Sequence, residues 1–316
     1  MKKGILTSIY FAGTLFVILL MTDRFLDFTV KKCNTGHLGK VNKILDKSIK
    51  PQIAIFGPSL GENGFNSLQI QRQTNKTVYN FCLAGTIFMQ YEGLINELNE
   101  KSNETEIFVL SEFVFNFQPR KQLTEIENYL PYLKNKNIYN SLASIDSELT
   151  YKSRYIPFYK FIAATNHYYT SSFRGLKHFI KGSKKNVDTL MGYLPVKKGW
   201  NKLEDDFIAN TLHIDIIIDS NIVNEYIKCV NALKQKGRKV VITIPPIYIP
   251  KGQKVVDLEP YRNTLKSIAQ KTNSVFWDFS ESMVDKKYFH NIDHLNTYGA
   301  LVFSNVFADS LNNLKQ

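Results

Sequence analysis

The sequence predicts an α/β protein built on a three-layer open parallel sheet. Two observations lead to this fold class: short runs of almost wholly apolar residues recur along the chain, and stretches of helical periodicity stand between them. A third feature, an apolar segment near the N-terminus, adds a transmembrane helix to the prediction. The hydrophobic fraction of 44% fits a folded chain and argues against disorder.

The N-terminal segment, residues 4–22, contains no charged residue and follows Lys2 and Lys3. A helix of about 17–25 residues is long enough to cross a bilayer core. The sequence after it, LLMTDRFLDF, has no small-residue cleavage site, so we expect an uncleaved signal anchor over residues 1–24, followed by a linker over residues 25–50. The two lysines predict a cytoplasmic N-terminus, which places the remaining chain on the extracytoplasmic side of the cytoplasmic membrane.

Five apolar runs bounded by turn residues are expected to form the sheet. Because they do not alternate between apolar and polar residues, they suit strands that are buried on both faces. The runs are Ile53 to Phe56, Thr77 to Phe81, Glu106 to Leu110, Lys239 to Ile244 and Ser274 to Trp277. Helical periodicity predicts helices at Phe88 to Asn99, Ile222 to Lys236, Pro260 to Lys271 and Ala300 to Leu314.

Residues 120–220 interrupt this alternation and are expected to be a helical or irregular insertion within a single domain over residues 51–316. A connection of this length is normally a functional cap, so we expect it over the active face. Its many tyrosines either stack on sugar rings or pack as ordinary half-buried residues. The turn formed by GYLP and KKGW makes Tyr193 and an exposed Trp200 candidates for contact with a substrate.

The net charge of +12 is dispersed over the chain in pairs such as Lys31-Lys32, without a run of five or six. Dispersed charge is typical of a solvated basic surface, and no motif indicates nucleic-acid recognition. The three cysteines are far apart, form no metal-type pair and are odd in number, which excludes a closed disulfide framework. Cys82 is expected to be a small buried residue. No motif indicates a metal, a nucleotide or another cofactor.

The stretch GPSLG, residues 57–61, follows the first predicted strand and makes Ser59 a candidate nucleophile. In an open parallel sheet, ligands bind beyond the carboxyl ends of the strands, where Ser59 falls. Pro58 keeps Gly57 extended, so the chain must turn sharply at the serine, although an ordinary turn or helix N-cap would look the same. An α/β-hydrolase elbow of the G-x-S-x-G type is excluded, because too few residues precede residue 53 for the earlier strands of that fold.

A base for Ser59 is expected in YFHNIDHLNTYGA, residues 288–300, where His294 precedes the final helix. Imidazole has a pKa suited to accepting a serine proton near neutral pH. Residues three apart share a face, so Asn291 is expected beside His294, whereas the adjacent Asp293 is expected to be poorly placed for the ring Nδ1. His290, one turn earlier, is a weaker alternative.

Two residues are candidate donors to an oxyanion. Gly85 follows the second strand in NFCLAGT, where the missing Cβ lets a backbone N–H come close to a ligand. Asn116 follows the third strand in VLSEFVFNFQP and would donate its side-chain amide, although a solvated loop residue fits the same pattern.

With a serine after the first strand, a glycine after the second and IDHLNTYGA before the last helix, the chain resembles the SGNH (GDSL-like) hydrolase superfamily over roughly residues 50–118 and 238–314. The resemblance is to its membrane-anchored extracytoplasmic branch, which includes the D-alanyl transfer protein DltD and alginate O-acetylation proteins. It implies a flavodoxin-like sheet, with Ser59 as nucleophile, His294 as base and Gly85 as oxyanion donor. The chain departs from the family pattern in its G-P-S motif, in Asn291 where an acid is usual, and in lacking G-x-N-D after the third strand.

The resemblance implies an acyl-ester hydrolase or an O-acyltransferase that acts on a cell-envelope polysaccharide through an acyl-enzyme. In the transferase case, a partner membrane protein would hand over the acyl group, and an acidic glycan would suit the basic surface. The competing hypothesis is a catalytically silent glycan-binding or scaffold protein of an envelope modification or export complex. Asn291 and the missing G-x-N-D favour that alternative, whereas the pairing of Ser59 with His294 favours the enzyme.

Overall fold

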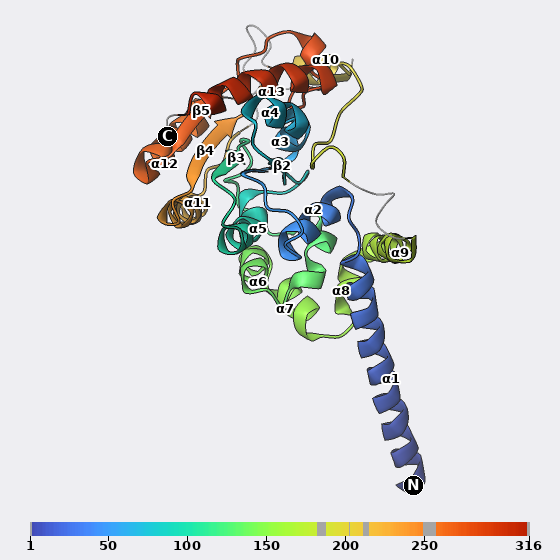
Figure 1. Cartoon of the computed structure of the whole chain (residues 1–316). Coiled ribbons are helices and arrows are strands. Elements are labelled where there is room, and N and C mark those ends of the chain that lie inside the picture. Colours follow the sequence, from blue (N-terminus) through green and yellow to red (C-terminus); the bar gives the residue numbers. More distant parts are fainter. Residues whose placement is uncertain (1, 182–187, 202, 211–214, 249–256, 315–316) are drawn as a thin grey trace.

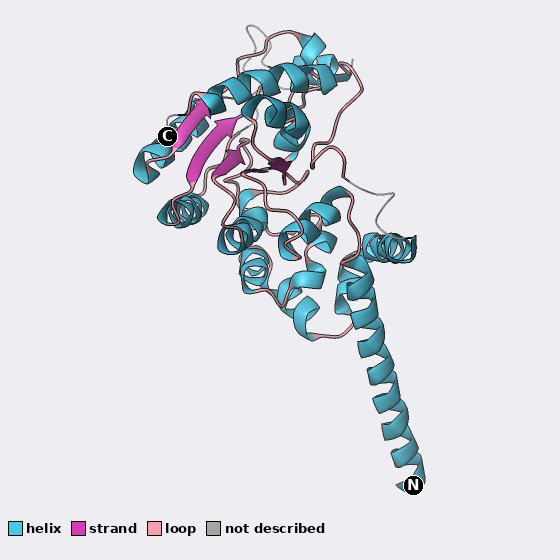
Figure 2. Ribbon diagram, in the orientation of Figure 1, coloured by secondary structure: helices cyan, strands magenta, loops and turns pink. Residues whose placement is uncertain are grey.

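A five-stranded parallel sheet of order β2-β1-β3-β4-β5 forms the centre of the computed structural model, which describes residues 2–181, 188–201, 203–210, 215–248 and 257–314 (Figures 1 and 2). The strands are β1 (Ile53–Phe56), β2 (Val78–Asn80), β3 (Ile107–Ser111), β4 (Lys239–Ile244) and β5 (Val275–Asp278). Each lies within one residue of its predicted bounds. The predicted α/β class, a flavodoxin-like open parallel sheet between helices, is confirmed.

Helices cover both faces of the sheet, which explains why the strands are apolar throughout. On one face, Ile53 and Ile55 of β1 belong to a core shared with α4 (Ser67–Thr74) and α13 (Thr297–Asn312). On the other, Ala54 and Phe56 belong to a core shared with α5 (Phe88–Lys101), α11 (Ser220–Gln235) and α12 (Glu259–Thr272). Successive side chains of a strand point to opposite faces, so a buried two-sided strand needs apolar residues at every position.

The long insertion is divided between two regions. Its described elements are η1 (Ile126–Asn128), η2 (Leu130–Tyr132), α6 (Lys136–Ala143), α7 (Ser147–Tyr155), α8 (Tyr159–Ala163), α9 (Thr165–Lys181) and α10 (Leu203–Asn210). Helices α6 to α9 pack along α5 and α1 (Lys2–Val30), away from α13 (Figure 1). Only residues 188–201 and α10 reach the segment that contains His294. The insertion therefore differs from the single cap over the active face that the sequence suggested.

The N-terminal region joins the folded body directly. Residues 3–30 of α1 are long and apolar enough to cross a membrane, and their most apolar 18-residue window has a mean hydropathy of 2.1 and no buried residue. The expected linker at residues 25–50 contains the end of α1 and α2 (Gly36–Leu45), and Val30, Val41 and Ile44 are fully or almost fully buried in the core. This part of the chain is thus folded structure, contrary to the expectation of a linker.

Two glycines allow α3 (Ser59–Gly64) to lie against the ends of the strands. At Gly57, which has a φ of 153°, an added Cβ would stand 2.4 Å from the carbonyl oxygen of Ser111. At Gly61, it would stand 2.5 Å from Cys82 Sγ and 2.7 Å from Ser111 Oγ. The second glycine of GPSLG is therefore explained by packing, without a motif of the elbow type.

Replacing Gly61 by alanine is expected to destabilise the chain by about 1–3 kcal/mol, because the new methyl group overpacks the contact with Cys82 and Ser111. Gly64→Ala is the matched control: it gains the same helix propensity in the same helix, and its Cβ would meet its nearest neighbours at an ordinary 3.9 Å. Urea unfolding of the full chain in detergent measures both variants. Equal stabilities for the two would contradict the close packing of α3.

Candidate active site

Ser59 is the first residue of α3, and α3 begins three residues after β1 ends. Pro58 is extended with a φ of −81°, and Gly57 supplies the unusual φ before it, so the chain turns into the helix at the serine as predicted. Ser59 is half-buried. Among the described residues, neither its Oγ nor its backbone N–H has a hydrogen-bond partner, so both are free to meet a ligand.

Two side-chain oxygens of its own loop lie beside Nδ1 of His294. Asn291 Oδ1 lies 3.0 Å from the ring Nδ1 and also accepts the backbone N–H of His294 at 2.8 Å. Asp293 Oδ1 lies 2.6 Å from the same Nδ1. With Nδ1 carrying a proton that Asn291 Oδ1 accepts, and with the Asp293 carboxylate beside it, Nε2 is the nitrogen left to act as a base.

The position of Asp293 corrects the expectation that adjacent side chains diverge. That expectation assumed a helical turn, in which neighbours point apart. The loop is instead closed by an antiparallel bridge between Phe289 and Leu295, and α13 begins only after Asn296, which caps it. In this non-helical loop, Asp293 reaches the ring of His294.

The Ser59 and His294 segments meet at the carboxyl edge of the sheet. Leu295, the neighbour of His294, has a methyl carbon 3.9 Å from the Cβ position of Gly64 at the end of α3. The loop after β4 is joined to the same segment, since the N–H of Tyr248 donates to the carbonyl of Ile292 at 2.7 Å. No hydrogen bond connects Ser59 Oγ to the His294 ring in the described part of the chain. Such bonds are often long before a ligand binds.

Gly85 is not closely packed, since an added Cβ would meet only Glu125 Cγ, at an ordinary 3.9 Å. Its φ of +74° is one that side chains disfavour, and its carbonyl accepts hydrogen bonds from Thr124 Oγ1 at 2.7 Å and Arg120 Nη1 at 3.0 Å. These bonds fix the orientation of the peptide between Gly85 and Thr86. No described residue accepts the N–H of Gly85, which is exposed.

Asn116 is placed differently from the prediction. It is 1% exposed, and its Nδ2 donates to Glu112 Oε2 at 2.8 Å and to Tyr91 Oη at 3.0 Å. Both amide hydrogens are therefore in use, and the predicted oxyanion role of Asn116 has no support in this arrangement. Glu112 itself is fully buried and also accepts the hydroxyls of Tyr226 and Tyr261. Burial raises the pKa of Glu112, while these hydrogen bonds act in the opposite direction.

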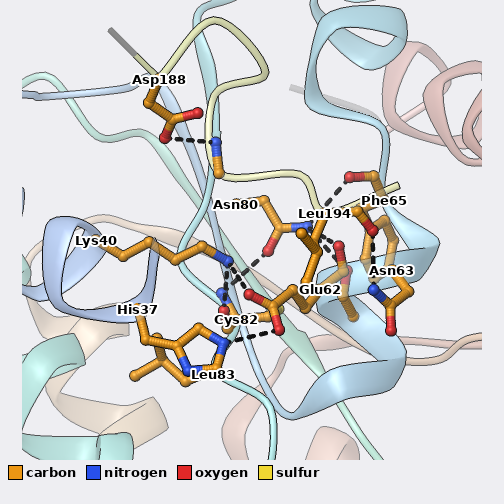
Figure 3. A network of polar contacts seen from close by, with 12 residues as sticks. His37, Lys40, Glu62, Asn63, Phe65, Asn80, Cys82, Leu83, Asp188 and Leu194 are labelled. Atoms are coloured by element: carbon orange, nitrogen blue, oxygen red, sulfur yellow. Dashed lines mark hydrogen bonds and ion pairs between the residues drawn. The ribbon is translucent and has the colours of Figure 1, made fainter. Parts of the chain in front are cut away.

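A buried ion-pair network adjoins the candidate nucleophile, on the same helix (Figure 3). Glu62, one turn after Ser59, contacts Lys40 Nζ at 2.7 Å through Oε1 and His37 Nε2 at 3.0 Å through Oε2. Lys40 Nζ also donates to the carbonyl of Cys82 at 2.7 Å. The network ties α2, α3 and the end of β2 together.

The electrostatics of this network favour its charged form. Burial alone would raise the pKa of Glu62, but the charge of Lys40 and the hydrogen bond from His37 outweigh it and lower that pKa to about 2. Burial alone would lower the pKa of His37, yet the bond to Glu62 and its charge raise it. Sequence reasoning missed these residues because Lys40 and His37 lie in the expected linker. The sequence did hold one signal: Glu62 follows Ser59 by three residues, so a helix that begins at Ser59 places both on one side.

A cavity of about 450 Å³ lies beside this network. His37, Lys40 and Glu62 line one part of it, and Tyr193 and Leu194 line another. The predicted substrate contact Tyr193 is only 5% exposed and packs in the core as well.

Trp200 is half-buried, in contrast to the exposed residue that was expected. Its ring packs edge-on against Tyr248 at 4.8 Å between centroids, with Lys286 Nζ 5.1 Å from its centre.

Residues 188–201 connect the two halves of the site. At one end, the N–H of Leu194 donates to the carbonyl of Glu62 at 3.1 Å. At the other, the N–H of Asn201 donates to the carbonyl of His290 at 2.8 Å, and His290 Nδ1 lies 3.0 Å from the carbonyl of Gly199. His290 is thus bound to this segment, which spans from α3 to the loop of His294.

No group of three or more His, Cys, Asp or Glu side chains suited to a metal ion occurs among the described residues. The three cysteines are buried free thiols. Burial raises the pKa of each of them, which disfavours the reactive thiolate.

No family model matches this chain, and no curated protein sequence is significantly similar to it. Among solved structures, one from Streptococcus pneumonia, provisionally described as a platelet activating factor, aligns with a TM-score of 0.42 and 11% identity over 96% of this chain and 99% of the other. A second, from Bacteroides fragilis and provisionally described as an acylhydrolase, aligns with a TM-score of 0.40 and 13% identity over 86% of this chain and 94% of the other. These TM-scores are too low to assign a function.

Glu62 makes the stability of the chain depend on pH in the acid range. Its folded pKa of about 2 lies below the value of 4.5 for an unperturbed glutamate, so its contribution is present above pH 4.5 and is lost as the pH falls towards 2. A shift of this size corresponds to about 3 kcal/mol. Urea unfolding of the full chain at a series of pH values is expected to show this loss.

Glu62→Gln is expected to flatten the acid dependence, although it also lowers stability near neutral pH because buried Lys40 then lacks its partner. Glu104→Gln, which breaks an exposed 3.3 Å pair with Lys50, is the control and should leave the pH dependence unchanged. An acid dependence as steep in Glu62→Gln as in the wild-type chain would contradict the assignment, since other carboxylates with lowered pKa values, such as Glu97, can account only for a residual slope.

Proposed function

We propose that the chain is an extracytoplasmic serine acyl-ester hydrolase or O-acyltransferase, with Ser59 as nucleophile and His294 as base. The observation that supports the proposal is the loop of His294, where Nδ1 is hydrogen-bonded to Asn291 Oδ1 and lies 2.6 Å from Asp293 Oδ1, while the hydroxyl of Ser59 has no partner among the described residues. A ring fixed in this tautomer presents Nε2, and a serine hydroxyl needs such a base to become nucleophilic.

In the proposed reaction, Ser59 Oγ attacks the carbonyl carbon of an acyl ester while His294 Nε2 takes the hydroxyl proton. The tetrahedral intermediate collapses, the ester C–O bond breaks, and the departing alcohol receives the proton from His294. The acyl group is then bound to Ser59 Oγ as an ester. Water or a sugar hydroxyl next attacks this acyl-enzyme and gives its proton to His294. The bond between the acyl carbon and Ser59 Oγ then breaks, and His294 returns the proton to Oγ, which regenerates Ser59.

Backbone groups are the proposed donors to the oxyanion. The N–H groups of Ser59 and Gly85 are unbonded among the described residues, and both follow strands that end at the same edge of the sheet. Preorganised backbone donors of this kind stabilise the charge that develops on the carbonyl oxygen. Asn116 is left out of this role because Glu112 and Tyr91 occupy its amide.

The proposed setting is the outer side of the cytoplasmic membrane, with α1 as a single-pass anchor. An enzyme held there is suited to a cell-envelope polysaccharide, and the net charge of +12 would favour an acidic glycan. Whether water or sugar accepts the acyl group depends on how well the site excludes water, to which residues 188–201 contribute. A transferase would also need a membrane partner that supplies the acyl group.

A catalytically silent glycan-binding or scaffold protein is the second candidate. Two observations favour it: Ser59 Oγ makes no hydrogen bond to His294, and Asn116 is committed to the buried Glu112 cluster. The two candidates differ in whether Ser59 reacts with an electrophile.

A serine-directed fluorophosphonate is expected to label the full chain in detergent, because it mimics the acyl carbon that Ser59 attacks. Ser59→Ala should abolish the labelling, and Ser282→Ala, which changes an exposed serine after β5, should retain it. Labelling that persists in Ser59→Ala would exclude this nucleophile. An unlabelled wild-type chain would support the silent alternative.

The two partners of His294 are expected to differ in effect on p-nitrophenyl acetate hydrolysis. His294→Ala should lower kcat by about 10²–10⁴-fold. Asp293→Asn should lower kcat at least about tenfold with little change in KM, because its charge stabilises the imidazolium that forms only during reaction. Asn291→Asp keeps an oxygen acceptor and should retain activity. If Asp293→Asn is fully active, Asp293 has no role in positioning the base.

A further inference from the structure

Helix α9 has three faces, and one of them is apolar and exposed. The first face is buried and consists of Tyr168, Ser172, Gly175 and His178. The second, here called the apolar stripe, consists of Tyr169, Phe173, Leu176 and Ile180, whose spacing places them on one side of the helix. The third is basic and exposed, with Arg174, Lys177 and Lys181.

The apolar stripe is strongly exposed for residues of its kind. Phe173 is 73% exposed and Ile180 is 72% exposed, while Ile162 in the adjoining α8 is 74% exposed. Contiguous apolar side chains on a surface mark a site of interaction, because leaving them in water costs free energy. Among the described residues, helix α1 is the neighbour that points to a lipid environment for this stripe, because it is long and apolar enough to cross a membrane.

The contacts between α9 and the last turns of α1 fix the position of the stripe. The hydroxyls of Thr29 and Ser172 lie 2.5 Å apart. The two backbones touch at Gly175, where an added Cβ would stand 1.8 Å from the carbonyl oxygen of Thr29. Phe28 also packs edge-on against Phe179, with 5.3 Å between ring centroids. These contacts fix the position of α9 against the last turns of α1.

Along the axis of α1, the contact with α9 lies close to the end of the apolar part of α1. Charged residues of α1 resume at Asp23, which together with Asp27 pairs with Lys160 of α8 at 3.2 and 2.6 Å. Thr29 lies six residues further, about 9 Å along the helix axis. In Figure 1, α9 crosses α1 steeply near this end. If α1 crosses a bilayer, α9 therefore runs along its surface, at the depth of the lipid headgroups.

The basic face supplies charge complementarity. Lys177 and Lys181 are both exposed and lie one turn apart on the side next to the apolar stripe. An apolar stripe bordered by lysines is the pattern of a helix that lies in a membrane interface, with apolar side chains towards the acyl chains and ammonium groups at the phosphates.

We propose that α9 docks on the bilayer leaflet in which the C-terminal end of α1 lies, through the apolar stripe and the lysines beside it. The partner is an anionic lipid surface. The inference rests on α1 as a membrane helix and is independent of the chemistry at Ser59, so fluorophosphonate labelling and the test below succeed or fail separately. It adds a second, in-plane contact that sets the orientation of the folded body over the membrane.

The test uses the full chain in liposomes of phosphatidylcholine and phosphatidylglycerol, with brominated acyl chains as the quencher. Phe173→Trp and Ile180→Trp each add an indole on the apolar stripe, and the emission of the wild-type chain, from Trp200 and Trp277, is subtracted. Side chains of an interfacial helix enter the boundary of the acyl chains by about 5–10 Å, so the added indoles should lose about half of their emission.

His167→Trp is the matched control, because His167 is exposed on the same helix and nearly opposite the apolar stripe. The fraction of emission that its added indole loses should be no larger than the fraction lost by Trp200 and Trp277 in the wild-type chain. Equal quenching in His167→Trp and Phe173→Trp would overturn the proposed orientation, and an absence of quenching in both stripe variants would overturn the docking itself. The Ile180→Trp variant shows whether a result at Phe173 holds for a second position on the apolar stripe.

Lipid charge and self-association are tested in the same system. Lys177→Glu combined with Lys181→Glu should reduce quenching of the Phe173→Trp indole, as should phosphatidylcholine alone. Quenching that is unchanged by both the charge reversal and the neutral lipid would refute the role of the lysines.

A second copy of the chain is the competing occupant of the apolar stripe. A disulfide-linked dimer formed on copper-phenanthroline oxidation of Phe173→Cys would show that the stripe contacts protein, and would overturn the proposal.

Discussion

The close approach of α3 to the strand ends is the constraint on which the candidate site depends. It is possible only because Gly57 and Gly61 lack a Cβ where Ser111 and Cys82 stand within 3 Å of that position. The approach holds Ser59 at the carboxyl edge of β1 and directs Glu62 of the same helix inwards. A carboxylate buried in this way must be paired, and Lys40 and His37 provide the partners.

Lys40 and His37 also connect the site to the N-terminal helix α1. Both lie on α2, and α2 is bound to the end of α1, since Asn42 Nδ2 donates to the carbonyls of Val30 at 3.1 Å and Cys33 at 2.6 Å. Helix α2 therefore makes polar contacts both with the end of α1 and with the helix that begins with Ser59. The position of α1 relative to the folded body and the position of the proposed nucleophile consequently depend on the same short helix, α2.

Residues 188–201 give the site its second dependence on distant parts of the chain. Gly192, with a φ of +81°, lies so close to β2 that an added Cβ would stand 2.0 Å from the carbonyl oxygen of Asn80. From there the segment bonds to Glu62 and then to His290. The relative placement of Ser59 and His294 thus depends on a segment that belongs to neither motif, which is why substitutions far from both could alter it.

The sequence by itself determined the strands and the chain positions of Ser59, Gly85 and His294, because apolar runs and the ends of parallel strands are local properties. Tertiary structure decided which side chains those residues meet. Periodicity placed Asn291 beside His294 but could not show that a non-helical loop also brings Asp293 to Nδ1. The sequence was equally consistent with Asn116 in a crevice, and only the structure shows that Glu112 and Tyr91 bind its amide. Likewise, Lys40 was assigned to a linker, and only the structure shows its ion pair with Glu62. Such pairings depend on how separate helices pack, and no local pattern records that packing.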